Sequence, residues 1–393
     1  DESLPTYAAY LAALGDKAAA TSLITIEGEE MRLKSDSYIR AKNVKDVSLT
    51  PYSTYQKVLN VQDENSIKKS GQKALWEFEV EESGLYTLAF KYIQAANGNM
   101  TCYRTVAIDG AVPYKELESV AFPYRSGNGY HNLIPVDEQG NPLRVYLEKG
   151  MHTLFVQVNG AVYDAVYKEI KEIMADINDL AMSIKKLVGN NTDKNRTWDV
   201  EDYLPDVSQR LAFMEERTNT IYQTLREIVG KEPTFANNLR YAATNLRKLK
   251  EDPRTLPNRL TLLSEGVGST AQAFGDLLPI LESQPVGFDK LYLAGDTAAL
   301  PRAKAGFFTG LWESLKSFFY SFSPEMSDSN YSVSGKNSDG LQVWVNRPVQ
   351  YLEIMQQMAD AQFTANGGMK VNFSIMPNEQ KLILANASRT NPD

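Results

Sequence analysis

LQVWVNRPVQYLEIMQQMADAQFTANGGMKVNFSIMPNEQKLILANASRTNPD, residues 341–393, is the stretch of this chain that best defines a type of fold. Its first five residues, 341–345, are a short apolar run, and apolar side chains then recur at helical spacing up to a pair of glycines that starts at Gly367. Alternation over 369–375 predicts a second strand, and 379–387 is again helical in pattern. The order strand, helix, strand, helix predicts the beginning of a parallel α/β domain.

Parallel strands have to be covered on both faces, and a unit of this size cannot cover its own sheet. We therefore expect the chain to be an N-terminal part of a larger protein. From VWVNRP, which starts at Val343, to the final NPD, the residues resemble the opening of the mature extracellular solute-binding proteins, family 1, of ABC carbohydrate importers. The resemblance rests on the order of a strand, a helix, G-x-K-V, a proline, K-L and A-x-A-S.

This resemblance implies a function as well as a fold. The protein would be the oligosaccharide-binding component of an ABC transporter, outside the cell at its surface, with the permease subunits in the membrane as partners. A lipid anchor would be attached to a residue upstream of Asp1. Ligand would bind between two lobes, and Asn346 and Arg347 would lie at the mouth of that cleft, because such clefts form at the carboxyl ends of parallel strands.

The composition is that of ordinary globular protein. The 393 residues are 43% hydrophobic and 23% charged, and the net charge is −8. Lysines and arginines are not clustered as nucleic-acid binding requires, so we expect no nucleic acid as a partner. The chain contains no apolar run of about 18 residues that would predict a membrane span. Cys102 is the single cysteine, which excludes an internal disulfide and is compatible with export.

Residues 21–160 have an all-β pattern. Short alternating segments are separated by turns rich in Gly, Asn and Pro, and they lie at 23–27, 74–80, 85–92, 105–108, 144–147 and 153–158. This spacing predicts an antiparallel β-sandwich. Trp76 alternates with Phe78 and Val80 on one strand face, so we expect it in the core.

Four motifs of this region resemble the jelly-roll, galactose-binding-like carbohydrate-binding modules of families 6 and 35: ITIEGEE, ALWEFEVEESGLYTLAFKY, RTVAIDG and YLEKGMHTLFVQV. In those modules a last strand carrying an Asp closes the sandwich. Here such a strand does not follow Val158 and recurs only at 287–293. The resemblance therefore predicts that this late strand pairs with the strand around Ile26.

The interval between these strands is helical in pattern. Apolar side chains step by three and four residues, and Gly189, Gly230 and Pro233 separate the stripes. The stripes are Val162, Val166, Ile170, Ile173, Ile177, Leu180, Ile184 and Leu187; Val207, Leu211, Met214, Ile221, Leu225 and Ile228; Phe235, Leu239, Ala242, Leu246 and Leu249; and Leu260, Leu263, Val267, Phe274, Leu278 and Leu281. They predict an antiparallel four-helix bundle inserted between the last two strands of the sandwich.

We therefore expect a multidomain α and β protein. Its segments are an N-terminal helical segment, 1–20; the sandwich, 21–160 plus 285–298; the inserted bundle, 161–284; an amphipathic helix and linker, 299–340; and the incomplete α/β lobe, 341–393. The apolar face of the predicted helix at 303–322 must be covered by another part of the protein.

A cation site is predicted where the first strand meets the closing strand. Glu27 and Glu29 lie on the same side of the first strand, and Asp289 is expected beside them. Three carboxylates on adjacent strands suit Ca²⁺. The resemblance implies the same cofactor, because the opening acidic pair and the last-strand Asp hold a structural Ca²⁺ in those modules. The alternative is that the acidic pair forms a solvated face.

Sugar binding needs an aromatic platform and polar groups that can bond to hydroxyls. The segment FPYRSGNGYHN, which starts at Phe122, could supply both from one loop, with Tyr124, Asn128, Tyr130 and Asn132 as ligand-binding candidates. The alternative is that these rings cover an edge of the core. The binding-face Trp of the related modules is not identifiable in this sequence.

Catalytic patterns are not evident. His131 and His152 lack an HExxH context, and G-x-S-x-G does not occur. We therefore expect a non-catalytic protein. Besides the transporter component, two functions stay open: a structural or adhesive surface protein in which the bundle is a spacer, and the binding-module part of a secreted carbohydrate-active enzyme.

Overall fold

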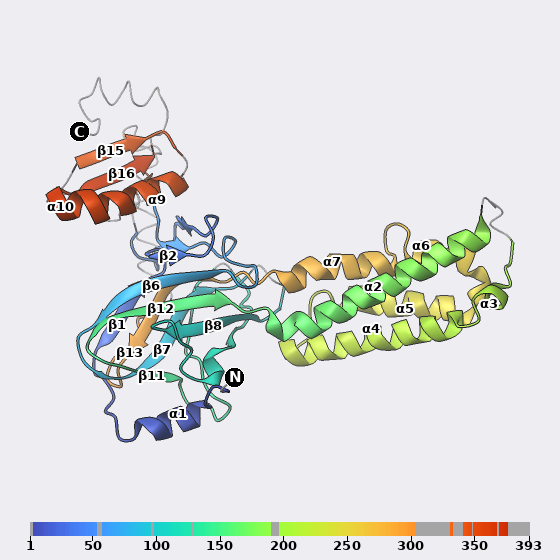
Figure 1. Ribbon diagram of the computed structural model, residues 1–393, viewed down its shortest axis with the longest axis horizontal. Coiled ribbons are helices and arrows are strands. Elements are labelled where there is room, and N and C mark those ends of the chain that lie inside the picture. Colours follow the sequence, from blue (N-terminus) through green and yellow to red (C-terminus); the bar gives the residue numbers. More distant parts are fainter. Residues whose placement is uncertain are drawn as a thin grey trace.

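The computed structural model describes residues 3–52, 57–95, 98–127, 129–189, 196–303, 331–332, 341–347, 349–367 and 369–375. A body of β-strands carries a long helical bundle at one end, and a smaller α/β unit lies on another side of that body (Figure 1). The protein is thus of mixed α and β type. The helices predicted at 303–322 and 379–387, and most of the linker, fall outside the described residues.

The body is built from two sheets of antiparallel strands. The first has the order β1-β13-β7-β10, with β11 also paired to β7. Its strands are β1 (Leu23–Glu27), β13 (Gly287–Ala294), β7 (Gly84–Ile93), β10 (His131–Leu133) and β11 (Arg144–Leu147). The second has the order β2-β6-β12-β8-β9. Its strands are β2 (Leu33–Lys34), β6 (Lys73–Val80), β12 (Gly150–Val158), β8 (Cys102–Ile108) and β9 (Val120–Phe122).

The two sheets share one apolar core. On β6, Trp76, Phe78 and Val80 alternate inward as predicted, and the ring of Trp76 meets Phe288 of the other sheet edge-on at 6.4 Å between centroids. The helix α1 (Tyr7–Leu14), whose N-cap is Thr6, and the single turn η1 (Lys115–Leu117) lie against this body. Tyr7 joins the core through a ring contact with Tyr114.

The prediction that the first and last strands are paired is confirmed. β1 and β13 run antiparallel, with Ile26 opposite Leu291 and Glu27 opposite Lys290. β13 in turn pairs with β7, so the late strand lies between two others and is buried along its whole length. A register shift between Phe288 and Lys290 marks a β-bulge in β13 at Asp289.

A segment for which the sequence patterns predicted no structure lies against β13. It contains the short pair β3 (Ala41–Lys42) and β5 (Val61–Gln62), and β5 contacts β13. Its polar side chains are fixed locally; for example, Asn60 exchanges two hydrogen bonds of 2.9 Å with the backbone of Val44. The strand that closes the sandwich therefore has both faces covered.

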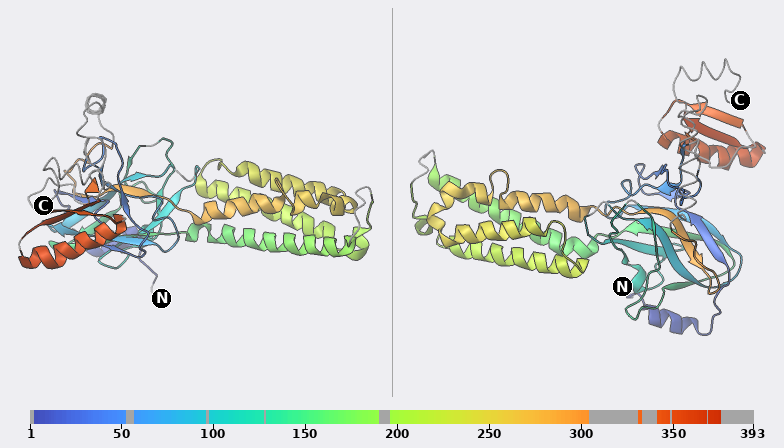
Figure 2. Two further views of the ribbon diagram at one scale, coloured as in Figure 1. Left: turned by 90° about the horizontal axis from the view of Figure 1, so that it is seen from above. Right: turned by 180° about the vertical axis from the view of Figure 1, so that it is seen from behind.

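The bundle lies in the chain between β12 and β13. Its long helices are α2 (Ala161–Val188), α4 (Val207–Val229), α5 (Ala236–Glu251) and α7 (Thr270–Glu282), joined by α3 (Val200–Tyr203), η2 (Pro253–Arg259) and α6 (Leu260–Leu263). α4 packs between α2 and α5, and α7 closes the ring against α5 and α2. Figure 2 shows the bundle as a straight rod leading away from the sheets. Among the described residues, no helix is both long and apolar enough to cross a membrane.

One predicted stripe is wrong in part. Val267 was expected on the apolar face of a continuous fourth helix, but it is 96% exposed. Gly266 and Gly268 on either side of it adopt φ of 85° and 82°, so the chain turns there. Ser269 then caps α7 by accepting a hydrogen bond from the backbone nitrogen of Gln272, and the stripe resumes at Phe274.

The C-terminal α/β unit has the predicted parallel pair. β15 (Leu341–Val345) lies parallel to β16 (Val371–Ile375), connected through α9 (Val349–Met358), the π-helical turn η3 (Ala359–Thr364) and α10 (Ala365–Gly367). The sheet continues through β14 (Tyr331–Ser332) to β4 (Lys57–Val58). This last strand comes from the segment that covers β13, so the unit is tied to the body by backbone pairing.

Candidate functional site

The predicted acidic cluster lies where β1, β13 and β7 meet, but two lysines lie within it. The Lys290 ammonium donates to Glu27 and to Oδ1 of Asp289, the latter at 3.0 Å. The Lys91 ammonium, from β7, lies 2.7 Å from Oδ2 of Asp289. Among the described residues, no donor meets hydrogen-bond geometry at this Oδ2. Its negative charge is balanced by the ion pair with Lys91.

The bulge in β13 explains how one strand supplies both a carboxylate and an ammonium group. Neighbouring residues of a regular strand point to opposite faces, but an extra residue at a bulge breaks that alternation. Asp289 and Lys290 can therefore contact each other. Asp289 is fully buried, and Lys290 is 5% exposed.

Glu29 was expected on the first strand beside Glu27, but β1 ends at Glu27 and Glu29 lies in the turn that follows, apart from these ion pairs. Its Oε2 is buried and accepts no hydrogen bond within the described part of the chain. Burial raises the pKa of this carboxyl to about 8, more than the nearby Lys290 lowers it. The raised pKa favours the protonated, neutral form of Glu29 at neutral pH.

This arrangement does not fit a Ca²⁺ ion. Ca²⁺ needs six to eight oxygen ligands around it, and here ammonium groups contact the two carboxylates that were expected to supply them. The described residues contain no group of three or more His, Cys, Asp or Glu side chains that could hold a metal ion. Calcium binding through Glu27, Glu29 and Asp289 stays an untested prediction.

The candidate sugar loop does not form one cluster of exposed ligands. Tyr130 is 1% exposed and belongs to a small apolar cluster with Leu49 and Val61, so as a correction it is a core residue and cannot act as a stacking platform in this structure. Tyr124 lies under the ammonium of Lys231, 5.4 Å from its ring centroid.

The two asparagines of that loop differ. The amide of Asn132 donates to the carbonyl of Pro301 at 2.8 Å and is solvent-exposed. Asn128 lies outside the described residues. Contact of Tyr124, Asn128 and Asn132 with a ligand remains a prediction.

Asn346 and Arg347 follow a parallel strand as expected, whereas their place at the mouth of a ligand cleft stays a prediction. They directly follow β15, at the carboxyl end of a parallel strand, and both are exposed. The Arg347 guanidinium donates to the carbonyl of Asn346 at 3.1 Å, which is a local contact. The guanidinium is thus accessible for a polar ligand at this edge of the sheet.

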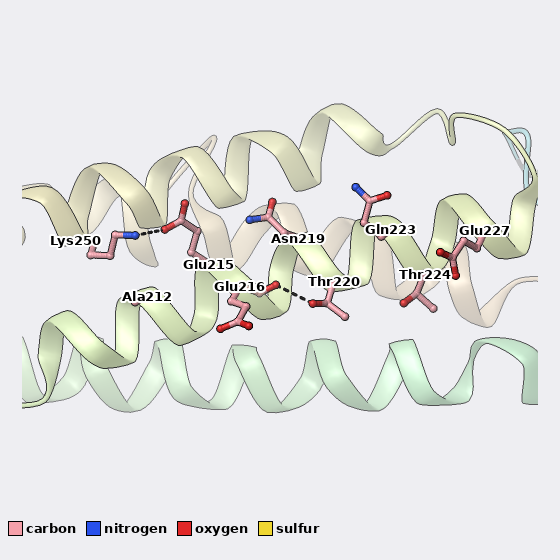
Figure 3. A pocket seen from close by; sticks show the side chains of 9 residues that line it. All are labelled: Ala212, Glu215, Glu216, Asn219, Thr220, Gln223, Thr224, Glu227 and Lys250. Atoms are coloured by element: carbon pink, nitrogen blue, oxygen red, sulfur yellow. Dashed lines mark hydrogen bonds and ion pairs between the residues drawn. The ribbon is translucent and has the colours of Figure 1, made fainter.

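A groove of about 580 Å³ runs along α4 in the bundle (Figure 3). The carboxylate of Glu215 is paired there with Lys250 of α5 at 2.5 Å. The groove is lined by Ala212, Glu215, Glu216, Asn219, Thr220, Gln223, Thr224, Glu227 and Lys250. This lining contains no aromatic ring, so it lacks the stacking platform that sugar sites commonly use.

Sequence reasoning missed the two lysines. Lys91 lies in the apolar run Leu85–Ile93, and a lysine in a strand buried on both faces requires a partner charge. That signal was present in the sequence. Which carboxylate it meets depends on strand register and on the bulge, which local patterns do not show.

Comparison with known proteins finds one family. Residues 165–281 match the family described as bacterial solute-binding protein, 4-helix bundle domain. The match covers the helices α2 to α7 and does not extend to the sheets. Among curated proteins, none matches the chain.

Several solved structures are similar to parts of the chain at low TM-score. A Paenibacillus cycloisomaltooligosaccharide glucanotransferase has 19% identity over 36% of this chain and 17% of its own, with a TM-score of 0.24. A Podospora anserina β-(1,4)-mannanase with a family 35 module has 14% identity over 36% and 25%, with a TM-score of 0.25. A family 35 carbohydrate-binding module from Clostridium thermocellum has 13% identity over 35% and 88%, with a TM-score of 0.27. The chain thus spans at most a quarter of the first two proteins.

Proposed function

We propose that this chain is the non-catalytic oligosaccharide-binding component of an ABC importer at the outer surface of a bacterial cell. The observation that carries the proposal is the match of residues 165–281 to the 4-helix bundle domain of bacterial solute-binding proteins. In this proposal the sandwich is a jelly-roll accessory module, and the α/β unit begins the lobe that forms the ligand cleft. The permease subunits and a lipid anchor upstream of Asp1 belong to the same proposal.

The α/β unit supports this reading in its own geometry. β15, α9 and β16 form a parallel strand–helix–strand unit, the building block of lobes that bind ligands at the carboxyl ends of their strands. Asn346 and Arg347 lie at that end. An amide and a guanidinium are groups that donate hydrogen bonds to sugar hydroxyls. The ligand class follows from the resemblance of the unit and of the sandwich to carbohydrate-binding proteins.

Binding of oligosaccharides to the intact protein tests the proposal. We expect a glycan array followed by isothermal titration to find a soluble oligosaccharide that binds without forming a hydrolysis product. Replacing Arg347 by Ala should weaken that binding about tenfold or more, because hydrogen bonds of charged groups contribute about 1.5–3 kcal/mol. Arg226→Ala, an exposed substitution on α4, is the matched control and should leave affinity unchanged.

Each other result contradicts the proposal in a different way. Release of shortened oligosaccharides would favour the secreted enzyme. Absence of binding to any glycan would favour the structural or adhesive protein with the bundle as a spacer. Binding that Arg347→Ala leaves intact would place the site away from the α/β unit.

A further inference from the structure

The ammonium groups of Lys91 and Lys290 contact more than carboxylates. Lys290 also donates to the carbonyl of Thr50 at 2.5 Å, and Lys91 donates to the carbonyl of Ser48. These carbonyls belong to one loop, which lies between β3 and β5 in the segment that covers β13. Two cations thus join three parts of the chain: β1 through Glu27, β13 through Asp289, and the loop through its backbone.

The acceptors around the two ammonium groups are all oxygens. They are the carboxylates of Glu27 and Asp289 and the carbonyls of Ser48 and Thr50. Carboxylate and carbonyl oxygens are also the ligands that Ca²⁺ prefers. The oxygen ligands of a cation site are therefore present, but the ammonium groups of Lys91 and Lys290 contact them in place of a metal ion.

We propose that Lys91 and Lys290 act as an internal cation pair, which does at this junction the work of a divalent metal ion: it holds the first strand and the Ser48–Thr50 loop to the closing strand. The sandwich then needs no metal for its stability. This inference concerns the fold of the sandwich and does not depend on the proposed transport function.

The ion pairs balance without a metal. The carboxylates of Glu27 and Asp289 face the ammonium groups of Lys91 and Lys290, two against two. Glu29 lies outside these pairs, and burial favours its neutral form. Nearby Asp289 and Glu27 raise the pKa of Lys290 against the opposing effect of burial, so its ammonium form persists. A further divalent ion would bring two uncompensated charges into a site that is already neutral.

Removing the ammonium groups should expose this role. Methionine keeps the length of the lysine stem and removes the charge, so Lys91→Met/Lys290→Met leaves Asp289 buried and unpaired. We expect its Tm in EDTA to fall by roughly 10 °C, because breaking a buried ion pair is strongly destabilising. The exposed Lys149→Met in the same sandwich is the matched control and should melt like the wild type.

Calcium provides the second readout. At constant ionic strength, EDTA and millimolar Ca²⁺ should leave the Tm of the wild type unchanged, whereas Ca²⁺ should raise the Tm of the double variant because the oxygens are then available. Should the double variant not fold, the two single variants carry the same test.

Three results would overturn the proposal. A wild-type Tm that falls in EDTA means that a metal ion binds in spite of the lysines. A double variant as stable as the wild type means that only the lysine stems matter. A double variant that loses stability but does not respond to Ca²⁺ means that the lysines do not replace a divalent ion.

Discussion

At the scale of single residues, Gly28 shows how closely the first strand is fitted to the last. Its amide donates to the carbonyl of Asp289 at 2.7 Å, and its carbonyl accepts from the indole of Trp76 at 3.2 Å. A Cβ on Gly28 would lie 2.2 Å from the carbonyl oxygen of Phe288. Backbone, not a flexible side chain, occupies that space, so the position requires a glycine.

Gly28→Ala should therefore destabilise the protein. Relieving the contact means moving the backbone of β13, and such overpacking typically costs about 1–3 kcal/mol. Gly275→Ala is the opposite control, because Gly275 lies in α7 with no atom within 4 Å of an added Cβ. It should be neutral or stabilise by up to about 1 kcal/mol. Urea denaturation measures the change in the free energy of unfolding for both variants. Equal stability of Gly28→Ala and the wild type would contradict the close approach of Gly28 to the backbone of Phe288.

Glu29 predicts a pH dependence of stability. Its pKa is about 8 in the folded protein against an ordinary value of 4.5, so the folded state binds more protons than the unfolded state between these pH values. The free energy of unfolding should then fall as the pH rises through this window, by at most about 1.4 kcal/mol per pH unit. Glu29→Gln removes this titrating carboxyl. The free energy of unfolding of the variant should therefore fall less steeply between pH 5 and pH 8 than that of the wild type. Parallel curves for the variant and the wild type would show that Glu29 is ionised in the fold.

At the scale of elements, the bundle is attached to the sandwich by a buried arginine. Arg104 of β8 is fully buried, and its guanidinium donates to the carbonyls of Tyr103, Ile67 and Gln284 at 2.9, 3.3 and 2.5 Å. Gln284 lies where α7 returns to β13. Tyr163 at the start of α2 donates to the carbonyl of Thr101 at 2.7 Å, so both ends of the insertion are fixed on the same strand region.

Arg104→Met should weaken this attachment. The substitution leaves three carbonyls without a charged donor in a buried place, and we expect a loss of about 2–4 kcal/mol in the free energy of unfolding. Arg226→Met, exposed on α4, should change it by less than about 0.5 kcal/mol. Chemical denaturation compares the two, and an Arg104→Met protein as stable as its control would mean that backbone and water alone satisfy these carbonyls.

The helices of the bundle could be predicted from the sequence because the spacing of apolar residues within each helix shows which of its faces is buried. Val166, Ile170, Ile173 and Ile177 step along α2 and are all buried in the structure. The failure at Val267 also has a local cause, since two glycines allow a turn that apolar spacing does not reveal. Contacts between distant strands are different. The pairing of β1 with β13 was predicted from a family resemblance, and the lysines at that junction were missed because their partners depend on register and on a bulge.

At the scale of the whole molecule, the parts differ in how much of their surface is covered. The sandwich and the bundle each have a closed core. In the described part of the α/β unit, one apolar face of α9 is open: Tyr351, Ile354 and Met358 are 57%, 55% and 55% exposed. Its sheet joins the body through β4, a strand of two residues that follows the Ser48–Thr50 loop in the chain. Among the residues that the structure describes, the unit is therefore attached by few backbone bonds and buries little apolar surface.

Hydrogen exchange should reveal this difference. In the described part of the chain, β15 and β1 are both edge strands of five residues, which makes β1 the matched control for β15. β1 is paired with the fully buried β13, whereas β15 belongs to a unit with an exposed apolar helix face. We expect the amides of Val343–Val345 to exchange about 100-fold faster than those of Ile24–Ile26, equivalent to about 2.7 kcal/mol less opening free energy. Equal protection of the two strands in the monomer would show that the α/β unit is stable without further covering, despite the exposed face of α9.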